Sequence, residues 1–166
     1  AQFTGFGLQT AALAVGGLSL GPNAVIGATE SWNGTSWTTS PATLNTARFA
    51  MGSCGATNTA ALAFGGQEPA PLYADTETWN GTSWTEVNDM NVARSGLVGM
   101  GTSSSALGAA GSVSSVPVAN TEEWDVVTRG AWATGGSLNT GRFGLAGGGT
   151  QTSALAFGGA TPPNIN

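Results

Sequence analysis

Residues 76–84 read TETWNGTSW, which places two tryptophans on either side of an Asn-Gly turn signal. The same wording occurs at 29–37 as TESWNGTSW, and its first half returns at 121–124 as TEEW. The first tryptophan of each copy, Trp32, Trp79 and Trp124, therefore recurs after 47 and then 45 residues. A fixed period of this size indicates stacked supersecondary units, each of which buries its apolar surface against its neighbours.

Two further elements recur in step with the tryptophans. An apolar residue, an asparagine and an arginine follow the second tryptophan as LNTAR at 44–48, MNVAR at 90–94 and LNTGR at 138–142. An apolar run that ends in a small pair reads ALAVGG at 12–17, ALAFGG at 61–66 and 154–159, and ALGAAG at 106–111. We assign a structural role to the repeated tryptophans, arginines and Gly-Gly pairs, which are Trp32, Trp37, Trp79, Trp84, Trp124, Trp132, Arg48, Arg94, Arg142, Gly16, Gly17, Gly65, Gly66, Gly158 and Gly159.

Each unit predicts four short antiparallel strands. In the second unit we expect a Gly- and Met-rich strand that follows Arg48 and runs to about Gly55, a small apolar strand at 60–66, an alternating strand at 75–79 and an outer strand at 82–87. Asn80-Gly81 predicts a type I′ hairpin turn between the last two strands. The units are expected at about 1–40, 41–88, 89–134 and 135–166, within one domain, and the last is a half unit.

This arrangement resembles the Kelch repeat, whose blades carry a Gly-Gly pair, an aromatic residue, a tryptophan about six residues later, and then a Met or Leu and an arginine. Those places are occupied here by Gly65, Gly66, Trp79, Trp84, Met90 and Arg94. The sequence departs from the family where Kelch blades usually carry tyrosine, because tryptophan stands there. The resemblance implies an all-β fold, namely a Kelch-like β-propeller arc of about 3.5 four-stranded blades.

The expected strand count does not close a ring. About fourteen strands make three blades and a half, whereas propellers close with four to eight complete blades. The half blade would leave an exposed strand edge, which other chains readily pair with. We therefore expect the sequence to be a segment of a larger propeller, or to be completed by strands of another polypeptide in a larger assembly.

The wording of the repeat is also similar to Kelch-like repeats in the structural proteins of tailed phages, especially marine phages. This resemblance implies a virion or extracellular location, with partners that are other virion proteins or a host-surface glycan. The chain has four basic residues, nine acidic residues and a net charge of −5. A protein of this charge lacks a basic face for nucleic acid, and we find no apolar run of about 20 residues that would cross a membrane.

Catalytic chemistry has few candidate residues. The sequence has no histidine and one cysteine, which excludes ordinary zinc and copper sites and a Ser-His-Asp triad. Glu30, Glu77 and Glu122 stand at equivalent repeat positions, which favours a repeated structural role over a catalytic pair. We therefore predict a non-enzymatic protein without a cofactor or a metal. For the repeated arginines two interpretations stay open: a buried group that bonds carbonyls or a repeat glutamate, and a ring of guanidinium groups that binds an anion.

Binding is expected in the loops that follow the Gly-Gly pairs, because these loops vary between repeats while the scaffold recurs. The candidate residues are Gln67, Glu68, Tyr73, Asp75, Asn23 and Asn120. The leading hypothesis is a structural and interaction module of a phage virion or tail that binds a protein or a host surface. The alternative is a free lectin-like propeller that binds glycans through repeated Trp and Asn sites, and a glycan-active enzyme comes third.

Overall fold

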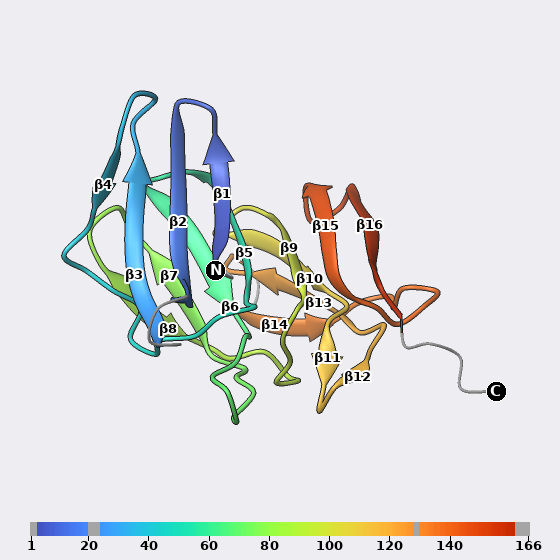
Figure 1. Cartoon of the computed structure of the whole chain (residues 1–166). Coiled ribbons are helices and arrows are strands. Elements are labelled where there is room, and N and C mark those ends of the chain that lie inside the picture. Colours follow the sequence, from blue (N-terminus) through green and yellow to red (C-terminus); the bar gives the residue numbers. More distant parts are fainter. Residues whose placement is uncertain (1–2, 20–23, 128–129, 162–166) are drawn as a thin grey trace.

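The computed structural model describes residues 3–19, 24–127 and 130–161 (Figure 1). The described part is entirely β-structure and contains no helix. It forms three four-stranded antiparallel sheets, a two-stranded sheet near the C-terminus and a small hairpin. The prediction of an all-β fold built from four-stranded antiparallel sheets is confirmed.

Each four-stranded sheet is an antiparallel meander, because its strands pair in the order in which they occur along the chain. The first sheet consists of β1 (Thr4–Leu8), β2 (Ala11–Leu18), β3 (Val25–Trp32) and β4 (Trp37–Thr39). The second consists of β5 (Gly52–Thr57), β6 (Ala60–Phe64), β7 (Thr76–Trp79) and β8 (Trp84–Val87). The third consists of β9 (Val98–Gly101), β10 (Ser105–Ala109), β13 (Thr121–Asp125) and β14 (Ala131–Thr134).

The remaining strands form two hairpins. The last sheet pairs β15 (Phe143–Gly149) with β16 (Ala154–Ala160), which are drawn in orange-red and dark red in Figure 1. The variable loop of the third unit folds into β11 (Ser112–Val113) and β12 (Val116–Pro117). Every sheet lies inside one of the four expected units, at about 1–40, 41–88, 89–134 and 135–166.

The sheets are stacked through their first strands. β1 contacts β5, β5 contacts β9, and β9 contacts β15. Backbone bonds join the starts of these strands: Gly96 N, just before β9, donates to Ala50 O, just before β5, at 2.7 Å, and Gly144 N in β15 donates to Gly96 O at 2.8 Å. Apolar cores fill the space between neighbouring sheets, such as the cluster of Leu62, Phe64, Met90, Leu97, Trp124 and Trp132. Each sheet therefore depends on its neighbour for the burial of its apolar side chains.

The Asn-Gly turns differ from the prediction. The strand pair β7–β8 ends at Trp79 opposite Trp84, so the loop has four residues instead of two. The Asn80 Oδ1 atom accepts hydrogen bonds from the amides of Thr82 and Ser83, each at 2.9 Å. In this loop only Gly81 has a positive φ, whereas a type I′ turn needs two such residues. The predicted type I′ turn is wrong, because the asparagine side chain organises a four-residue loop that the backbone bond from Asn80 N to Ser83 O at 3.4 Å closes.

Candidate functional site

A buried ion pair ties the segment before β5 to the third strand of the second sheet. Arg48 Nη1 donates to Glu77 Oε1 at 2.6 Å, and both side chains are fully buried. The other carboxylate oxygen, Glu77 Oε2, accepts from the backbone amide of Asn45 at 2.8 Å and from its Nδ2 atom at 2.9 Å. Such a charge is tolerated in the interior because hydrogen bonds replace the water that it has lost.

The third sheet contains the same arrangement. Arg94 Nη1 donates to Glu122, whose Oε2 atom accepts from the Asn91 amide at 2.7 Å and from Asn91 Nδ2 at 2.8 Å. Burial lowers the pKa of the Arg94 guanidinium from its usual range, and the bond to Glu122 and its charge oppose that shift. Arg48 and Arg94 thus occupy the structural position described by the first of the two interpretations, and neither guanidinium is free to bind an added anion.

The tryptophans hold one sheet to the next. Trp84 Nε1 donates to Thr29 Oγ1 of the preceding sheet at 2.9 Å, and Trp132 Nε1 donates to Thr76 Oγ1 at 2.9 Å. The first tryptophan of each unit instead donates to a backbone carbonyl in the turn between the first two strands of its own sheet, at Gln9, Asn58 and Ser103. These five indole N–H groups therefore donate within the protein, whereas the Trp37 ring is 50% exposed. A glycan site at the repeated Trp and Asn residues stays a prediction.

The Gly-Gly pairs provide a third link between sheets. Gly65 and Gly66 have φ angles of 63° and 101°, a region that residues with a Cβ rarely adopt. Gly66 N donates to Arg94 O at 2.9 Å, and Gly17 N donates to Arg48 O at 3.0 Å. The repeat arginine is thus held through both its side chain and its carbonyl, which explains why the pair and the arginine recur together.

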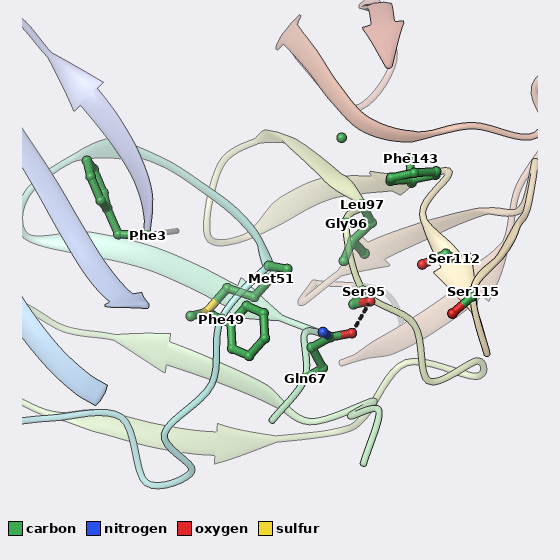
Figure 2. A pocket seen from close by; sticks show the side chains of 12 residues that line it. Phe3, Phe49, Met51, Gln67, Ser95, Gly96, Leu97, Ser112, Ser115 and Phe143 are labelled. Carbon is green, nitrogen blue, oxygen red and sulfur yellow. Dashed lines mark hydrogen bonds between the residues drawn. The ribbon is translucent and has the colours of Figure 1, made fainter. Parts of the chain in front are cut away.

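A cavity lies where the first strands of successive sheets begin (Figure 2), and we call it the inner pocket. It has a volume of about 580 Å³. Its lining consists of aromatic, aliphatic, hydroxyl and amide groups, contributed by Phe3, Phe49, Ala50, Met51, Gln67, Ser95, Gly96, Leu97, Ser112, Ser115, Phe143 and Gly144. No ionisable side chain is among them. A pocket of this composition suits a neutral ligand with both apolar and hydroxyl surface.

Backbone bonds fix the wall of the inner pocket. Phe49 N donates to Gln67 O at 3.0 Å, and Gln67 N donates to Phe49 O at 2.9 Å. Ser95 and Ser112 exchange the equivalent pair of bonds one sheet further on. The Ser95 hydroxyl also donates to Gln67 Oε1 at 2.7 Å, as the dashed line in Figure 2 shows. The wall is therefore ordered before a ligand arrives, which lowers the entropic cost of binding.

Of the loop residues predicted from the sequence, Gln67 lines the inner pocket and Glu68, Tyr73 and Asp75 form a group beside it. Desolvation, a hydrogen bond to Glu68 and the charges of Glu68 and Asp75 all raise the pKa of the Tyr73 hydroxyl. These residues are thus coupled electrostatically, but they do not line the inner pocket.

Asn120 does not join that group. Its backbone carbonyl accepts from Ala110 N at 2.8 Å, which is the bond that Asp75 O makes with Gly65 N at 3.1 Å in the second sheet. Asp75 and Asn120 are therefore the same repeat position in two sheets, where the backbone closes the end of the second strand. Asn23, the remaining candidate, lies outside the described residues.

Sequence reasoning missed the phenylalanines of the inner pocket. Phe49 and Phe143 each follow a repeat arginine directly, and Ser95 takes that place in the third unit. The available signal was a position that varies next to one that recurs. A position of this kind belongs to the repeat, but the recurring contacts between sheets do not fix its side chain. Here that side chain lines the inner pocket.

The described residues contain no group of three or more His, Cys, Asp or Glu side chains placed to hold a metal ion. They also contain no helix of the length and apolar character needed to span a membrane. No protein-family model and no curated protein matches the chain. The proposals below therefore depend on the geometry of the sheets, the inner pocket and the repeat.

Proposed function

We propose that the chain is a Kelch-like β-propeller arc of about three and a half blades that acts as a non-enzymatic structural and interaction module. One observation carries this proposal. In the second and third units the recurring arginines and tryptophans make contacts within and between sheets, while several residues that line the inner pocket vary between units. Phe49, Ser95 and Phe143 stand at one repeat position, as do Gln67 and Ser112. This division between a constant frame and a variable cavity is typical of binding scaffolds.

The resemblance to tailed-phage proteins extends the proposal to location and partner. On that basis the module belongs to a virion or a phage tail, where it contacts another virion protein or a host surface. The low charge of the chain and the uncharged lining of the inner pocket support a partner that is recognised through shape and neutral polar groups. A partner of that kind is bound with little dependence on salt, because few ion pairs are involved.

A glycan is the second candidate partner, and the lining of the inner pocket is the observation that favours it. Phe3, Phe49 and Phe143 provide aromatic surface, and Gln67 and Ser95 provide amide and hydroxyl groups nearby. Aromatic rings cover the apolar face of a sugar, and amide and hydroxyl groups bond its hydroxyls. Because the inner pocket is one cavity built from several units, this proposal expects one glycan site per chain instead of one per blade.

The test compares two phenylalanines on an array of neutral oligosaccharides and bacterial surface polysaccharides. Phe143 lines the inner pocket and is 40% exposed, whereas Phe157 is 54% exposed and lies outside it. The substitution Phe143→Ser copies the residue that the third unit carries at Ser95. We expect saturable binding with one site per chain, weakened at least about tenfold by Phe143→Ser and unchanged by Phe157→Ser. One site per blade would favour the free lectin, and turnover of a glycoside by the unmodified protein would refute the non-enzymatic assignment.

A further inference from the structure

Two glutamates of the repeat occupy equivalent buried sites. Glu77 of β7 lies opposite Ala63 of β6, and its carboxylate is held by Arg48 and Asn45. In the third sheet the same set consists of Glu122, Gly108, Arg94 and Asn91. In both sites the arginine bonds one carboxylate oxygen, and the backbone and side chain of the asparagine bond the other. The repeat thus contains a socket for the glutamate of a third strand.

The last sheet carries the same socket as an open pocket. This pocket of about 200 Å³ is lined by Leu138, Asn139, Thr140, Arg142, Leu145 and Ala156. Each of these residues stands at the repeat position of a residue in the second unit, namely Leu44, Asn45, Thr46, Arg48, Met51 and Ala63. Arg142 is partly exposed, and its Nη1 atom donates to Gly158 O at 3.0 Å. Its guanidinium therefore keeps donors for a further acceptor.

The strand beside this pocket, β16, pairs on one side only in the part of the chain that the structure describes. In the second and third sheets the second strand, β6 or β10, pairs on both sides. Within the described residues β16 pairs with β15 alone. Leu155 and Phe157 of β16 are 67% and 54% exposed. An edge of this kind presents backbone donors and acceptors in a row that accepts another strand.

We propose that the free edge of β16 and the pocket at Arg142 together form a receptor for an extended peptide strand that carries a glutamate. The strand pairs antiparallel with β16 and places its glutamate opposite Ala156, where the carboxylate bonds Arg142 and Asn139. The receptor recognises the pattern Thr-Glu-x-Trp, since a glutamate and a tryptophan two residues apart lie on the same face of a strand. In the second and third sheets that tryptophan bonds a backbone carbonyl of the first hairpin, and the turn at 150–153 offers the same position.

Charge complementarity fixes the chemistry of the partner. A carboxylate that faces a guanidinium forms a strong charge-assisted bond, and the asparagine amide supplies the second donor. A strand with glutamine at this place keeps its shape but loses the charge, so the pocket discriminates between them. The pocket at Arg142 shares no lining residue with the inner pocket, so the experiments on the two sites have independent outcomes.

A synthetic peptide with the sequence of residues 118–126, VANTEEWDV, tests this proposal by titration against the whole chain. Glu122 and Glu123 are neighbours in this peptide and point to opposite faces of a strand, so they form a matched pair. We expect Glu122→Gln in the peptide to weaken binding about tenfold and Glu123→Gln less than about twofold. Arg142→Met in the protein should remove the difference between the two peptides. Hydrogen exchange should slow at β16 when the peptide binds.

Equal effects of the two peptide substitutions, or binding that leaves exchange at β16 unchanged, would overturn the proposal. A fused version keeps the test decisive if the free peptide binds weakly. The same nine residues follow Asn166 through a flexible Gly-Ser linker, which raises their local concentration to the millimolar range. We expect the fused strand to raise the midpoint temperature of unfolding. Glutamine at the Glu122 position of the fused strand should reduce this rise more than glutamine at the Glu123 position. No rise with any fused strand would also contradict the receptor.

Discussion

Residues 61–66 and residues 154–159 have the same sequence, ALAFGG, and they meet different surroundings. In β6 the Leu62 and Phe64 side chains are fully buried, at 0% exposure. In β16 their counterparts Leu155 and Phe157 are 67% and 54% exposed. β6 pairs with β5 and β7, and the third sheet covers its outward side chains, whereas β16 pairs with β15 alone in the described part.

The contrast teaches that burial in this molecule is a property of neighbours, not of strand sequence. Two of the three tryptophans in the outer strands show the same contrast: Trp84 is 6% exposed and bonds Thr29 of the sheet before it, whereas Trp37 is 50% exposed. A repeat protein of this kind gains its stability at the contacts between units. The same side chain should therefore contribute much more to stability and protection inside the stack than at its ends. Matched pairs of equivalent positions test this rule.

Thiol reactivity should give the largest contrast. Burial raises the pKa of Cys54 to about 12, so at pH 8 very little of this thiol is the reactive thiolate. Gly148 stands at the same place in β15, opposite Leu155 as Cys54 is opposite Leu62, and a Cβ added there meets nothing within 4 Å. We expect the Gly148→Cys thiol, in a Cys54→Ala background, to react with an aromatic disulfide reagent at least about a thousandfold faster than Cys54 at pH 8. Similar rates would show that the second and third sheets open as freely as the end of the stack.

The repeated arginines should give the next contrast. Arg94→Ala leaves the carboxylate of Glu122 buried without its charged partner, which should lower the free energy of unfolding by about 3–5 kcal/mol. Arg142→Ala removes the equivalent side chain where it is partly exposed, and its effect should stay within about 0.5 kcal/mol. Urea unfolding followed by tryptophan fluorescence measures both values. A loss of similar size in the two variants would contradict the assignment of Arg94 to a buried structural site.

The shared apolar strand should give the third contrast. Leu62→Ala creates a cavity in the core between the second and third sheets, with an expected loss of about 3 kcal/mol in the free energy of unfolding. Leu155→Ala truncates the same residue of the same hexapeptide at an exposed site, where we expect a change within about 0.5 kcal/mol. Chemical denaturation of the two variants checks the pair. Equal losses would mean that β16 is covered in solution.

The fourteen strands of the four main sheets could be predicted because the repeat supplies several independent copies of each signal, whereas the hairpin β11–β12 in a variable loop was not predicted. The tryptophans, the Gly-Gly pairs and the alternating third strand place the sheet-forming strands of the second unit within about three residues of their observed bounds. The turn at Asn80 could not be predicted in detail. Asparagine can enter a turn through a positive φ or through its side chain, and the dipeptide alone does not choose between these.

The candidate site was less accessible to sequence reasoning. Arg48 and Glu77 recur in step, but they lie 29 residues apart, and only the fold shows that they meet. The inner pocket joins Phe3, Phe49, Ser95 and Phe143 from four units, and no local pattern marks a cavity that distant segments create together. The period identifies which residues are equivalent, whereas contact between different repeat positions depends on how the sheets are stacked.

The link between Trp84 and Thr29 should give the smallest contrast that is still measurable. Thr29→Val keeps the volume of the side chain but removes the acceptor for the buried indole N–H, which should cost about 2 kcal/mol. Thr121 takes the same place in β13, and in the described part of the chain no indole donates to it. Thr121→Val should therefore change the free energy of unfolding by less than about 0.5 kcal/mol, because valine suits a strand as well as threonine does. Equal losses of stability in both variants would mean that the threonine stabilises its own strand. The hydrogen bond between sheets would then not explain why threonine recurs at this position.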